Sequence, residues 1–158
     1  SSFFENALRK AKTAAERTGE ISLADDSGLE VDALGGAPGI YSARYAGEDA
    51  DDARNIAKLL KDLEGVPQEQ RRASFRCVLV LCRPDGRCES FEGRWEGSIA
   101  QVPVGKNGFG YDPVFHLPGR GITVAELSPD EKNRLSHRAR ALEKLKRWIL
   151  KGGNENGA

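Results

Sequence analysis

The sequence of 158 residues contains no methionine, only three cysteines and no excess of charge of either sign. Lys plus Arg number 24 and Asp plus Glu number 24, so no overall electrostatic field favours binding to nucleic acid or to an anionic membrane surface. No apolar run approaches the roughly 20 residues that span a bilayer, and the N-terminus lacks the basic-then-apolar layout of a signal peptide. We therefore expect a cytoplasmic protein that binds any polyanion through a local cluster of side chains.

The three cysteines are Cys77, Cys82 and Cys88, and their spacing fits neither a paired disulfide framework nor a C-x-x-C metal site. We predict that all three are reduced thiols. Because Cys77 and Cys82 lie in a β-rich run, we expect them to pack as small hydrophobic side chains. Since the sequence begins at Ser1 and contains no methionine, we also expect that its start is trimmed.

The composition is that of one ordinary globular domain, with 39% hydrophobic and 30% charged residues. We expect a single domain over residues 1–158, with a polar, disordered tail at 152–158. Capping residues and apolar side chains at helical spacing predict helices over 2–18, 51–63 and 128–150. In the last segment Ser128 and Ser136 give two successive starts. The stripe expected to pack inward there is Leu142, Leu145, Trp148 and Ile149.

Extended patterns predict the strands, and turn residues separate them. The first two strands are expected at 21–24 and 29–34, on either side of an acidic turn at 25–28 and before a glycine loop at 35–39. A hairpin is expected from 73–82 and 87–93 through the turn 84–86, followed by a strand at 95–102 and a loop at 103–113. Helices and strands in this order predict an α/β fold with a mixed central sheet flanked by helices.

Asp25 and Asp26 follow an apolar strand, at a position where ligands of α/β sheets collect. Adjacent side chains of an extended chain point to opposite faces, so the two carboxylates act as a pair only if the backbone turns between them. We expect one to face the ligand and the other the scaffold. A single carboxylate at a strand end can support Mg²⁺, which keeps several waters and bridges phosphates. The alternative interpretation of this segment is an Asx-type turn without chemistry.

The segment Gly108–Pro113 places two aromatic rings and one carboxylate among glycines, which let a planar ligand approach closely. Phe109 and Tyr111 could stack on a base. Asp112 could accept the N1 hydrogen of a 6-oxo purine, a hydrogen that adenine lacks. A tight turn with core aromatic side chains is the alternative.

Lys132, His137 and Arg138 lie where helical periodicity breaks and restarts at Ser136, near a helix N-terminus that can donate to an anion or a carbonyl oxygen. Arg138 could donate to a purine O6. The alternative is a set of basic residues on a surface helix that face only water. Lys10, on the first amphipathic helix, is by itself equally typical of a solvated helix face.

Taken together, five blocks in this order and spacing resemble the Ham1-like inosine/xanthosine triphosphate pyrophosphatase family. They are SFFENA at 2–7, ADDSGL at 24–29, GGAPGIYSARY at 35–45, GFGYDP at 108–113 and SHR at 136–138. The resemblance covers almost the whole chain and implies an elongated mixed α/β fold that forms homodimers. It also implies Mg²⁺-dependent hydrolysis of inosine, deoxyinosine and xanthosine triphosphates to the monophosphate and pyrophosphate, which cleanses the nucleotide pool.

The same resemblance implies roles for individual residues. Asp26 would bind the metal ion and act as the general base that activates the attacking water, while Ser27 beside it would contact the substrate. Lys10 and Lys132 would contact the triphosphate or the nucleotide. The base-binding site would be formed by Phe109, Gly110, Tyr111 and Asp112, with His137 and Arg138 at the 6-oxo edge.

One part of the family pattern is absent from this sequence. Members begin with a strand, a phosphate-contacting loop of the type Thr/Ser-x-Asn-x-x-Lys, a helix and a metal-binding Glu. We therefore expect the chain to be N-terminally incomplete and, as written, to turn over little. Two other functions stay open: a non-catalytic nucleotide-binding or dimerisation module, and a phosphatase with an aspartyl nucleophile, although such enzymes resemble Asp-x-Asp and not Asp-Asp.

Overall fold

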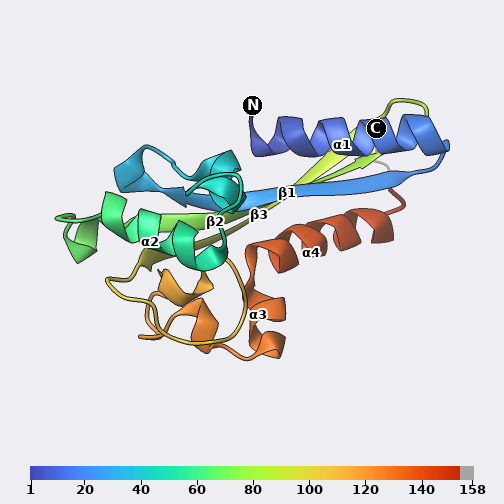
Figure 1. The fold of residues 1–158 in the computed structure, drawn as a ribbon. Helices are drawn as coiled ribbons and strands as arrows, with labels where there is room; N and C mark the ends of the chain where they lie inside the picture. Colours follow the sequence, from blue (N-terminus) through green and yellow to red (C-terminus); the bar gives the residue numbers. More distant parts are fainter. Residues whose placement is uncertain (154–158) are drawn as a thin grey trace. The chain divides into compact units, whose positions relative to one another are not determined.

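The computed structural model describes residues 1–153, and residues 154–158 of the expected disordered tail lie outside this range. The helices of this part of the chain are α1 (Phe3–Thr18), α2 (Asp52–Asp62), α3 (Pro129–Leu135) and α4 (His137–Leu150). Its strands are β1 (Ser22–Val31), β2 (Arg72–Cys82), β3 (Cys88–Ile99) and β4 (Phe115–His116). The strands form one sheet in the order β1-β2-β3-β4, and Figure 1 labels the first three of them. The predicted α/β class is confirmed.

The chain divides into two compact units. The first contains Ser1–Ser27, Arg76–Arg94 and the residues from Leu135 onward, and the second contains Gly28–Phe75 and Trp95–Arg134. Strands β1, β2 and β3 each contribute residues to both units. The single domain expected over the whole chain stays a prediction.

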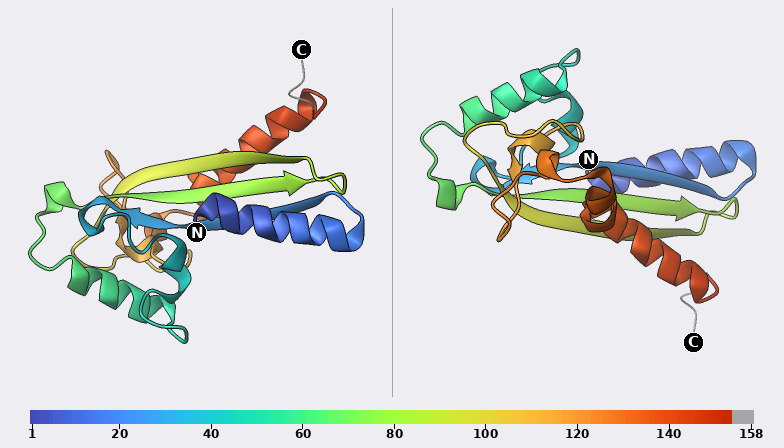
Figure 2. Two further views of the ribbon diagram at one scale, coloured as in Figure 1. Left: turned by 90° about the horizontal axis from the view of Figure 1, so that it is seen from above. Right: turned by 90° about the horizontal axis from the view of Figure 1, so that it is seen from below.

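In the first unit, α1 and α4 lie on opposite faces of the strands (Figures 1 and 2). Helix α1 begins where predicted, because the Ser2 side chain accepts the Glu5 N–H at 3.1 Å, and it ends at Gly19. Its buried side chains are small apart from the first one, which lets the helix pack closely on the strands. They are Phe3, Ala7, Ala11 and Ala15.

Helix α4 packs on the other face of the first unit, where its side chains join those of β2 and β3. The cluster contains Cys77, Leu79, Phe91, Ala141 and Leu145, with Leu81 and Trp148 packed against it. The Phe91 and Trp148 rings meet edge to face at 5.5 Å between centroids. The predicted inner stripe of this helix is partly wrong, since Leu142 and Ile149 are 43% and 54% exposed.

Gly93 explains which side of α4 faces the sheet. A Cβ atom at this position would lie 2.6 Å from the Ala141 N atom and closer still to the His137 carbonyl oxygen. The backbone of α4 therefore lies directly on β3 at this glycine, and Ala141 is the residue that faces inward. Leu142, one position further round the helix, is consequently turned toward solvent.

Two of the predicted strand ends are wrong. The acidic segment 25–28 was expected to turn, but β1 continues through it for 10 residues. Likewise, β3 runs for 12 residues through Gly93, where the sequence predicted two separate strands. In both places, hydrogen bonding to neighbouring strands outweighs the local preference of Gly, Ser and Asp for turns, because sheet pairing satisfies backbone groups over the full strand.

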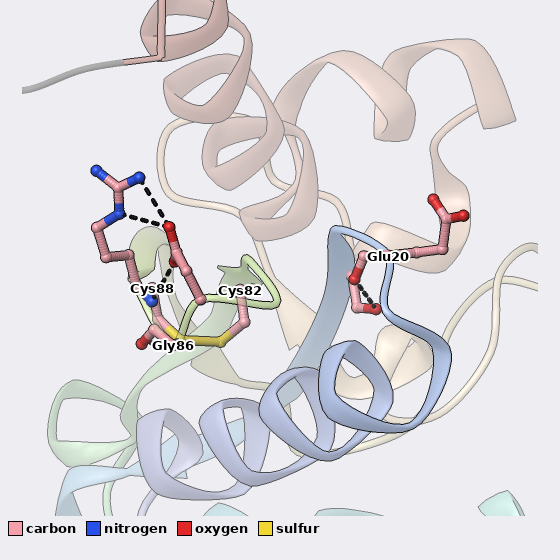
Figure 3. The surroundings of a disulfide bond; sticks show 7 residues. Glu20, Cys82, Gly86 and Cys88 are labelled. Carbon is pink, nitrogen blue, oxygen red and sulfur yellow. Dashed lines mark hydrogen bonds and ion pairs between the residues drawn. A yellow bond between two sulfur atoms is a disulfide. The ribbon is translucent and has the colours of Figure 1, made fainter.

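The predicted hairpin between β2 and β3 is confirmed, but the prediction of three reduced thiols is wrong. Cys82 and Cys88 form a disulfide across the end of the hairpin (Figure 3). The turn brings them together, because the Arg83 N–H donates to the Arg87 carbonyl oxygen at 2.8 Å and closes the two strands. Cys77 is a free, buried thiol, as its position in a β-rich run suggested.

The second unit has its own aromatic core. The rings of Phe75 and Phe115 stack at 4.3 Å between centroids, and Trp95 lies 6.1 Å from Phe115. Helix α2 begins as predicted, with the Asp51 carboxylate accepting the Arg54 N–H at 2.8 Å. Strand β4 is an edge strand of the sheet. It pairs antiparallel with β3, with Ser98 opposite His116 and Ile99 opposite Phe115.

Within residues 1–153 there is no helix with both the length and the apolar character needed to cross a membrane.

The contact at Gly93 predicts a measurable loss of stability. In Gly93→Ala, the added methyl group would meet the backbone of α4, which cannot move aside as a flexible side chain can. We expect the free energy of unfolding to fall by about 3 kcal/mol, measured by urea denaturation. Ser90→Ala, at an exposed position of the same strand, is the control and should unfold as the wild type does. An unchanged midpoint for Gly93→Ala would contradict the packing described.

Candidate functional site

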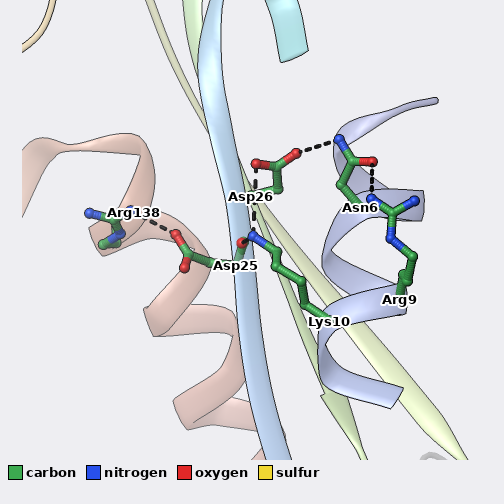
Figure 4. Close-up of polar contacts among 6 residues, drawn as sticks. All are labelled: Asn6, Arg9, Lys10, Asp25, Asp26 and Arg138. Atoms are coloured by element: carbon green, nitrogen blue, oxygen red, sulfur yellow. Dashed lines mark hydrogen bonds and ion pairs between the residues drawn. The ribbon is translucent and has the colours of Figure 1, made fainter. Parts of the chain in front are cut away.

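The two adjacent carboxylates of β1 point to opposite faces of the strand (Figure 4). Asp25 faces α4, where its Oδ2 lies 2.7 Å from Nη2 of Arg138. Asp26 faces α1, where its Oδ2 accepts a hydrogen bond from the Asn6 side chain at 3.0 Å. The opposite orientation of these two side chains, which is expected for an extended backbone, is confirmed.

Asp26 lies beside an amide and an ammonium group from one face of α1. Asn6 and Lys10 are one helical turn apart, so both side chains reach the same stretch of β1. The Lys10 Nζ atom lies 4.0 Å from Oδ1 of Asp26 and also donates to the Asp25 carbonyl oxygen. The Asp26 side chain is 23% exposed and that of Lys10 is 53% exposed, so a ligand can reach both groups from solvent.

These residues fit a hard divalent cation in one respect. Asp26 offers carboxylate oxygens, and Mg²⁺ takes one or two protein carboxylates and fills its other positions with water and substrate phosphate. Among residues 1–153 no group of three or more His, Cys, Asp or Glu side chains is placed to hold a metal ion. The described residues thus provide one acidic ligand and not a full set of protein ligands.

Arg138 is held at the start of α4 by the strands of the first unit. Ser136 caps this helix by accepting the Ala139 N–H at 3.1 Å, which places Arg138 in the first turn. Its guanidinium contacts Asp25, and burial raises the pKa of the Cys77 thiol, while the charge of Arg138 acts in the opposite direction. The arginine is therefore a fixed cation whose side chain stays 45% exposed.

Two further residues predicted for the site lie in the first unit. His137 is the first residue of α4 and is partly buried, with its carbonyl oxygen against Gly93. Ser27 is a partly buried residue of β1. Because side chains alternate along a strand, Ser27 is placed on the face of Asp25 and not on that of Asp26.

In the second unit, the two aromatic rings of the loop at 108–113 differ sharply. Phe109 is 66% exposed, whereas Tyr111 is 5% exposed. The Tyr111 hydroxyl donates to the Ser42 carbonyl oxygen at 2.6 Å, so this side chain fastens the loop to the unit. Of the two rings expected to stack on a base, Phe109 is the one that the loop presents to solvent.

Asp112 and Lys132 form a nearly buried ion pair next to that ring. The Lys132 Nζ atom lies 2.6 Å from Oδ2 of Asp112 and 4.0 Å from the centre of the Phe109 ring. The same carboxylate accepts the Phe109 N–H at 3.1 Å. Burial raises the pKa of the Asp112 carboxyl above its ordinary value, while Lys132 and the Phe109 N–H act in the opposite direction.

Glycine is required where the loop approaches its own carboxylate. A Cβ atom at Gly108 would collide with Oδ2 of Asp112 and would lie 3.3 Å from Nζ of Lys132. The next glycine, Gly110, donates its N–H to Oδ2 of Asp52 at 2.8 Å. The groups that these two glycines approach are protein carboxylates, and the close approach of a planar ligand stays a prediction.

Some of the predicted site residues contact one another within each unit. Lys10 meets Asp26 in the first, and Phe109, Asp112 and Lys132 meet in the second. Sequence reasoning missed Asn6, the partner of Asp26, although it stands one helical turn before Lys10. It also missed Asp52, for which the helix-capping pattern gave no functional signal.

A sequence model of the Ham1 family matches residues 1–148. The chain belongs to the Ham1 family. Two relatives within the family are both named dITP/XTP pyrophosphatase. That of Geobacillus kaustophilus is 59% identical over 145 residues, which cover 92% of this chain and 71% of the relative. That of Nitratidesulfovibrio vulgaris is 57% identical over 151 residues, covering 92% and 73%.

Solved structures of Ham1 proteins have the same fold as this Ham1 chain. The HAM1 protein from Coxiella burnetii aligns with a TM-score of 0.91 at 50% identity, over 96% of this chain and 78% of that one. The Ham1 protein of Staphylococcus aureus aligns with a TM-score of 0.92 at 47% identity, over 98% and 79%. The family expected from the five sequence blocks is confirmed.

The raised pKa of Asp112 predicts a pH-dependent difference between two proteins. A carboxyl group whose pKa is higher in the folded than in the unfolded state stabilises the fold at low pH, and this contribution is lost as pH rises through the folded-state pKa. The Asp112→Asn variant has no carboxyl group at this position, so its stability does not fall with rising pH for this reason. We expect the stability of this variant relative to the wild type to increase as pH rises from about 4 to 7.

Urea denaturation of both proteins at several pH values measures this difference. Asp130→Asn removes an exposed carboxylate of α3 and gives the effect of losing one surface charge. A stability difference that falls with rising pH would mean that Lys132 outweighs burial at Asp112.

Proposed function

We propose that this chain hydrolyses non-standard purine nucleoside triphosphates, those of inosine, deoxyinosine and xanthosine, to the monophosphate and pyrophosphate. The names of its relatives support this reaction. The observation that carries the proposal is the placement of Asp26. Its solvent-accessible carboxylate accepts a hydrogen bond from Asn6 and lies close to the Lys10 ammonium. Such a group can both bind a cation and accept a proton.

We propose that Asp26 would hold a divalent metal ion, Mg²⁺, through its carboxylate oxygens. When bound, the ion neutralises phosphate charge and lowers the pKa of water. The protein's own task is then mainly positioning, because phosphoryl transfer needs little covalent chemistry from side chains. No nucleophilic side chain is required.

In the proposed reaction, water attacks the α-phosphorus of the triphosphate. The bond between this phosphorus and the bridging oxygen breaks, and pyrophosphate leaves with that oxygen. Asp26 accepts the proton of the attacking water, and the Asn6 amide keeps the carboxylate oriented by its hydrogen bond. The Lys10 ammonium donates a hydrogen bond to the Asp25 carbonyl oxygen of β1 and places positive charge near the triphosphate. Its charge stabilises the negative charge that spreads over phosphate oxygens in the transition state.

We further propose that the loop of the second unit binds the base. Phe109 stacks on the purine, and Gly110 and Tyr111 shape the loop. Asp112 accepts the N1 hydrogen of a 6-oxo purine, with Lys132 as a nucleotide contact. From the family resemblance we also propose Ser27, His137 and Arg138 as substrate contacts, the last two at the 6-oxo edge.

Two properties implied by the family resemblance complete the proposal. We infer that the protein acts as a homodimer and that it works on the nucleotide pool of the cytoplasm. Nucleic acid is not among its partners in this proposal, because the sequence has equal numbers of acidic and basic residues. Analytical ultracentrifugation would test the dimer.

The central test is pyrophosphate release from inosine triphosphate, compared with ATP and GTP, with and without Mg²⁺. The protein used carries any native residues that precede Ser1. We expect metal-dependent release from inosine triphosphate that falls at least about 1,000-fold in Asp26→Asn, because the variant loses both the proton acceptor and the metal ligand. Asp32→Asn, which changes an exposed carboxylate nearby in the sequence, should keep wild-type activity.

The outcomes separate the other functions from this one. Tight, Mg²⁺-dependent nucleotide binding without product would favour a binding module. A trapped phospho-aspartate would favour a phosphatase with an aspartyl nucleophile, whereas pyrophosphate release without a covalent species excludes it. Full activity in Asp26→Asn would overturn the role proposed for this residue.

Lys10 gives a second, separable prediction. Lys10→Met keeps the apolar stem but removes the ammonium near Asp26, so the triphosphate loses an opposite charge. We expect KM for inosine triphosphate to rise about tenfold, with a smaller dependence of KM on salt concentration. Lys12→Met, on the exposed side of the same helix, is the control. Equal effects of the two substitutions would show that Lys10 acts only through general surface charge.

A further inference from the structure

We propose that Asp52 is a positioning residue, which holds the proposed base-binding loop in its binding conformation through the Gly110 N–H. The inference rests on the proposed function, because it concerns how that loop presents Phe109. Asp52 lies far from the loop in sequence, at the start of α2, and does not belong to any of the five sequence blocks that indicated the family.

The contact itself is short and comes from a rigid element. Oδ2 of Asp52 accepts the Gly110 N–H at 2.8 Å. Asp52 is the first residue of α2, whose start is fixed by the Asp51 cap on the Arg54 N–H. An acidic side chain in the first turn of a helix is also favoured by the helix dipole. The carboxylate is therefore presented to the loop from a fixed position.

Two carboxylates hold the peptide groups on either side of Phe109. The Phe109 N–H, in the peptide before this residue, donates to Asp112 at 3.1 Å. The Gly110 N–H, in the peptide after it, donates to Asp52 at 2.8 Å. With both flanking peptides fixed, the φ and ψ angles of Phe109 have little freedom, although its ring is 66% exposed.

The three anchors of this loop differ in what they can do. Tyr111 is buried and bonds to Ser42, and Asp112 is buried against Lys132, so both hold the loop to the interior. Asp52 is exposed and accepts the Gly110 N–H, in the peptide next to the exposed Phe109 ring. Its loss should free the Phe109 backbone without disturbing the core of the unit.

A loop that is ordered before binding avoids the entropy cost of becoming ordered when the base arrives. Asp52 should accordingly affect binding of the base more than the chemical step. A substitution that removes the acceptor raises KM and leaves kcat nearly unchanged, which is the signature of lost binding in both the ground state and the transition state. A variant that keeps a neutral acceptor oxygen retains part of the effect.

The test is steady-state hydrolysis of deoxyinosine triphosphate by three variants. We expect Asp52→Ala to raise KM about tenfold, as loss of a hydrogen bond to a charged group allows, with kcat within about twofold. Asp52→Asn should raise KM only about threefold, because its side-chain oxygen still accepts. Asp49→Ala, an exposed carboxylate just before α2, is the control and should leave KM unchanged.

A double-mutant cycle with Phe109→Ala shows whether Asp52 acts through the ring. If it does, removing Asp52 in the Phe109→Ala protein should change KM by less than about twofold, because coupled residues are not additive. The exchange rate of the Gly110 amide, followed by NMR, should rise in Asp52→Ala. The thermal midpoint of each variant reports any general loss of folding.

The outcomes distinguish this inference from the proposed function. An unchanged KM for Asp52→Ala, or the same rise in KM with and without the Phe109 ring, would overturn the positioning role while hydrolysis stands. If the wild type releases no pyrophosphate, the proposed function fails, and the Kd for inosine triphosphate replaces KM in the same cycle. An Asp52→Ala protein with unchanged Kd and unchanged Gly110 exchange would then overturn the inference.

Discussion

The extended backbone of β1 at Asp25 and Asp26 is the constraint on which the charged groups of the first unit depend. A strand turns successive side chains to opposite faces, so two adjacent carboxylates that would repel each other in a turn are separated by the sheet. Each then has a different helix as its neighbour. Asp25 is neutralised by Arg138 of α4, and within residues 1–153 Asp26 has Asn6 and a more distant Lys10 from α1 beside it. One carboxylate is committed to a salt bridge, and the other stays available to a ligand.

This division works only because both helices lie close to the strands. Helix α1 buries alanines, whose small side chains bring its Asn6 and Lys10 within reach of Asp26. Helix α4 lies on Gly93, which removes the side chain that would otherwise lift its first turn and Arg138 away from Asp25. Small residues at the contacts thus determine how far the polar side chains at the edges of the helices can reach. The loss of one such contact would displace a cation that lies many residues away in sequence.

In the second unit, by contrast, the charged side chains of one ion pair are buried. Asp112 and Lys132 are largely removed from water, and a buried ion pair is tolerated only when hydrogen bonds satisfy its remaining atoms. The Phe109 N–H supplies one of these bonds. The hydrogen bond that stabilises the buried carboxylate therefore also fixes the loop that carries the exposed ring. Arg71 follows the same rule, since the residue is 3% exposed and its guanidinium donates to the carbonyl oxygens of Val66, Leu63 and Ala100. This unit thus combines buried, hydrogen-bonded charges with aromatic packing.

The sequence by itself determined the features that depend on neighbours within one or two turns of chain. Helix starts at Ser2, Asp51 and Ser136 were predicted correctly, because a capping side chain bonds to a backbone N–H only a few residues away. The hairpin and the loop at 103–113 followed from glycine and proline for the same reason. The order of the five blocks also sufficed to indicate the family, and some of the residues it implied lie in contact, Lys10 with Asp26 and Lys132 with Phe109 and Asp112.

Only the tertiary structure decided the features that depend on pairing between distant segments. The continuity of β1 and β3 and the inner face of α4 contradict local patterns. In each case, contacts with another strand or helix outweigh the preference of a few residues, because they satisfy more hydrogen bonds or bury more surface. The same holds for Tyr111, which is buried while Phe109 is exposed, and for Asp52, whose partner lies 58 residues away along the chain. No spacing rule links residues so far apart, so their meeting is a property of the fold.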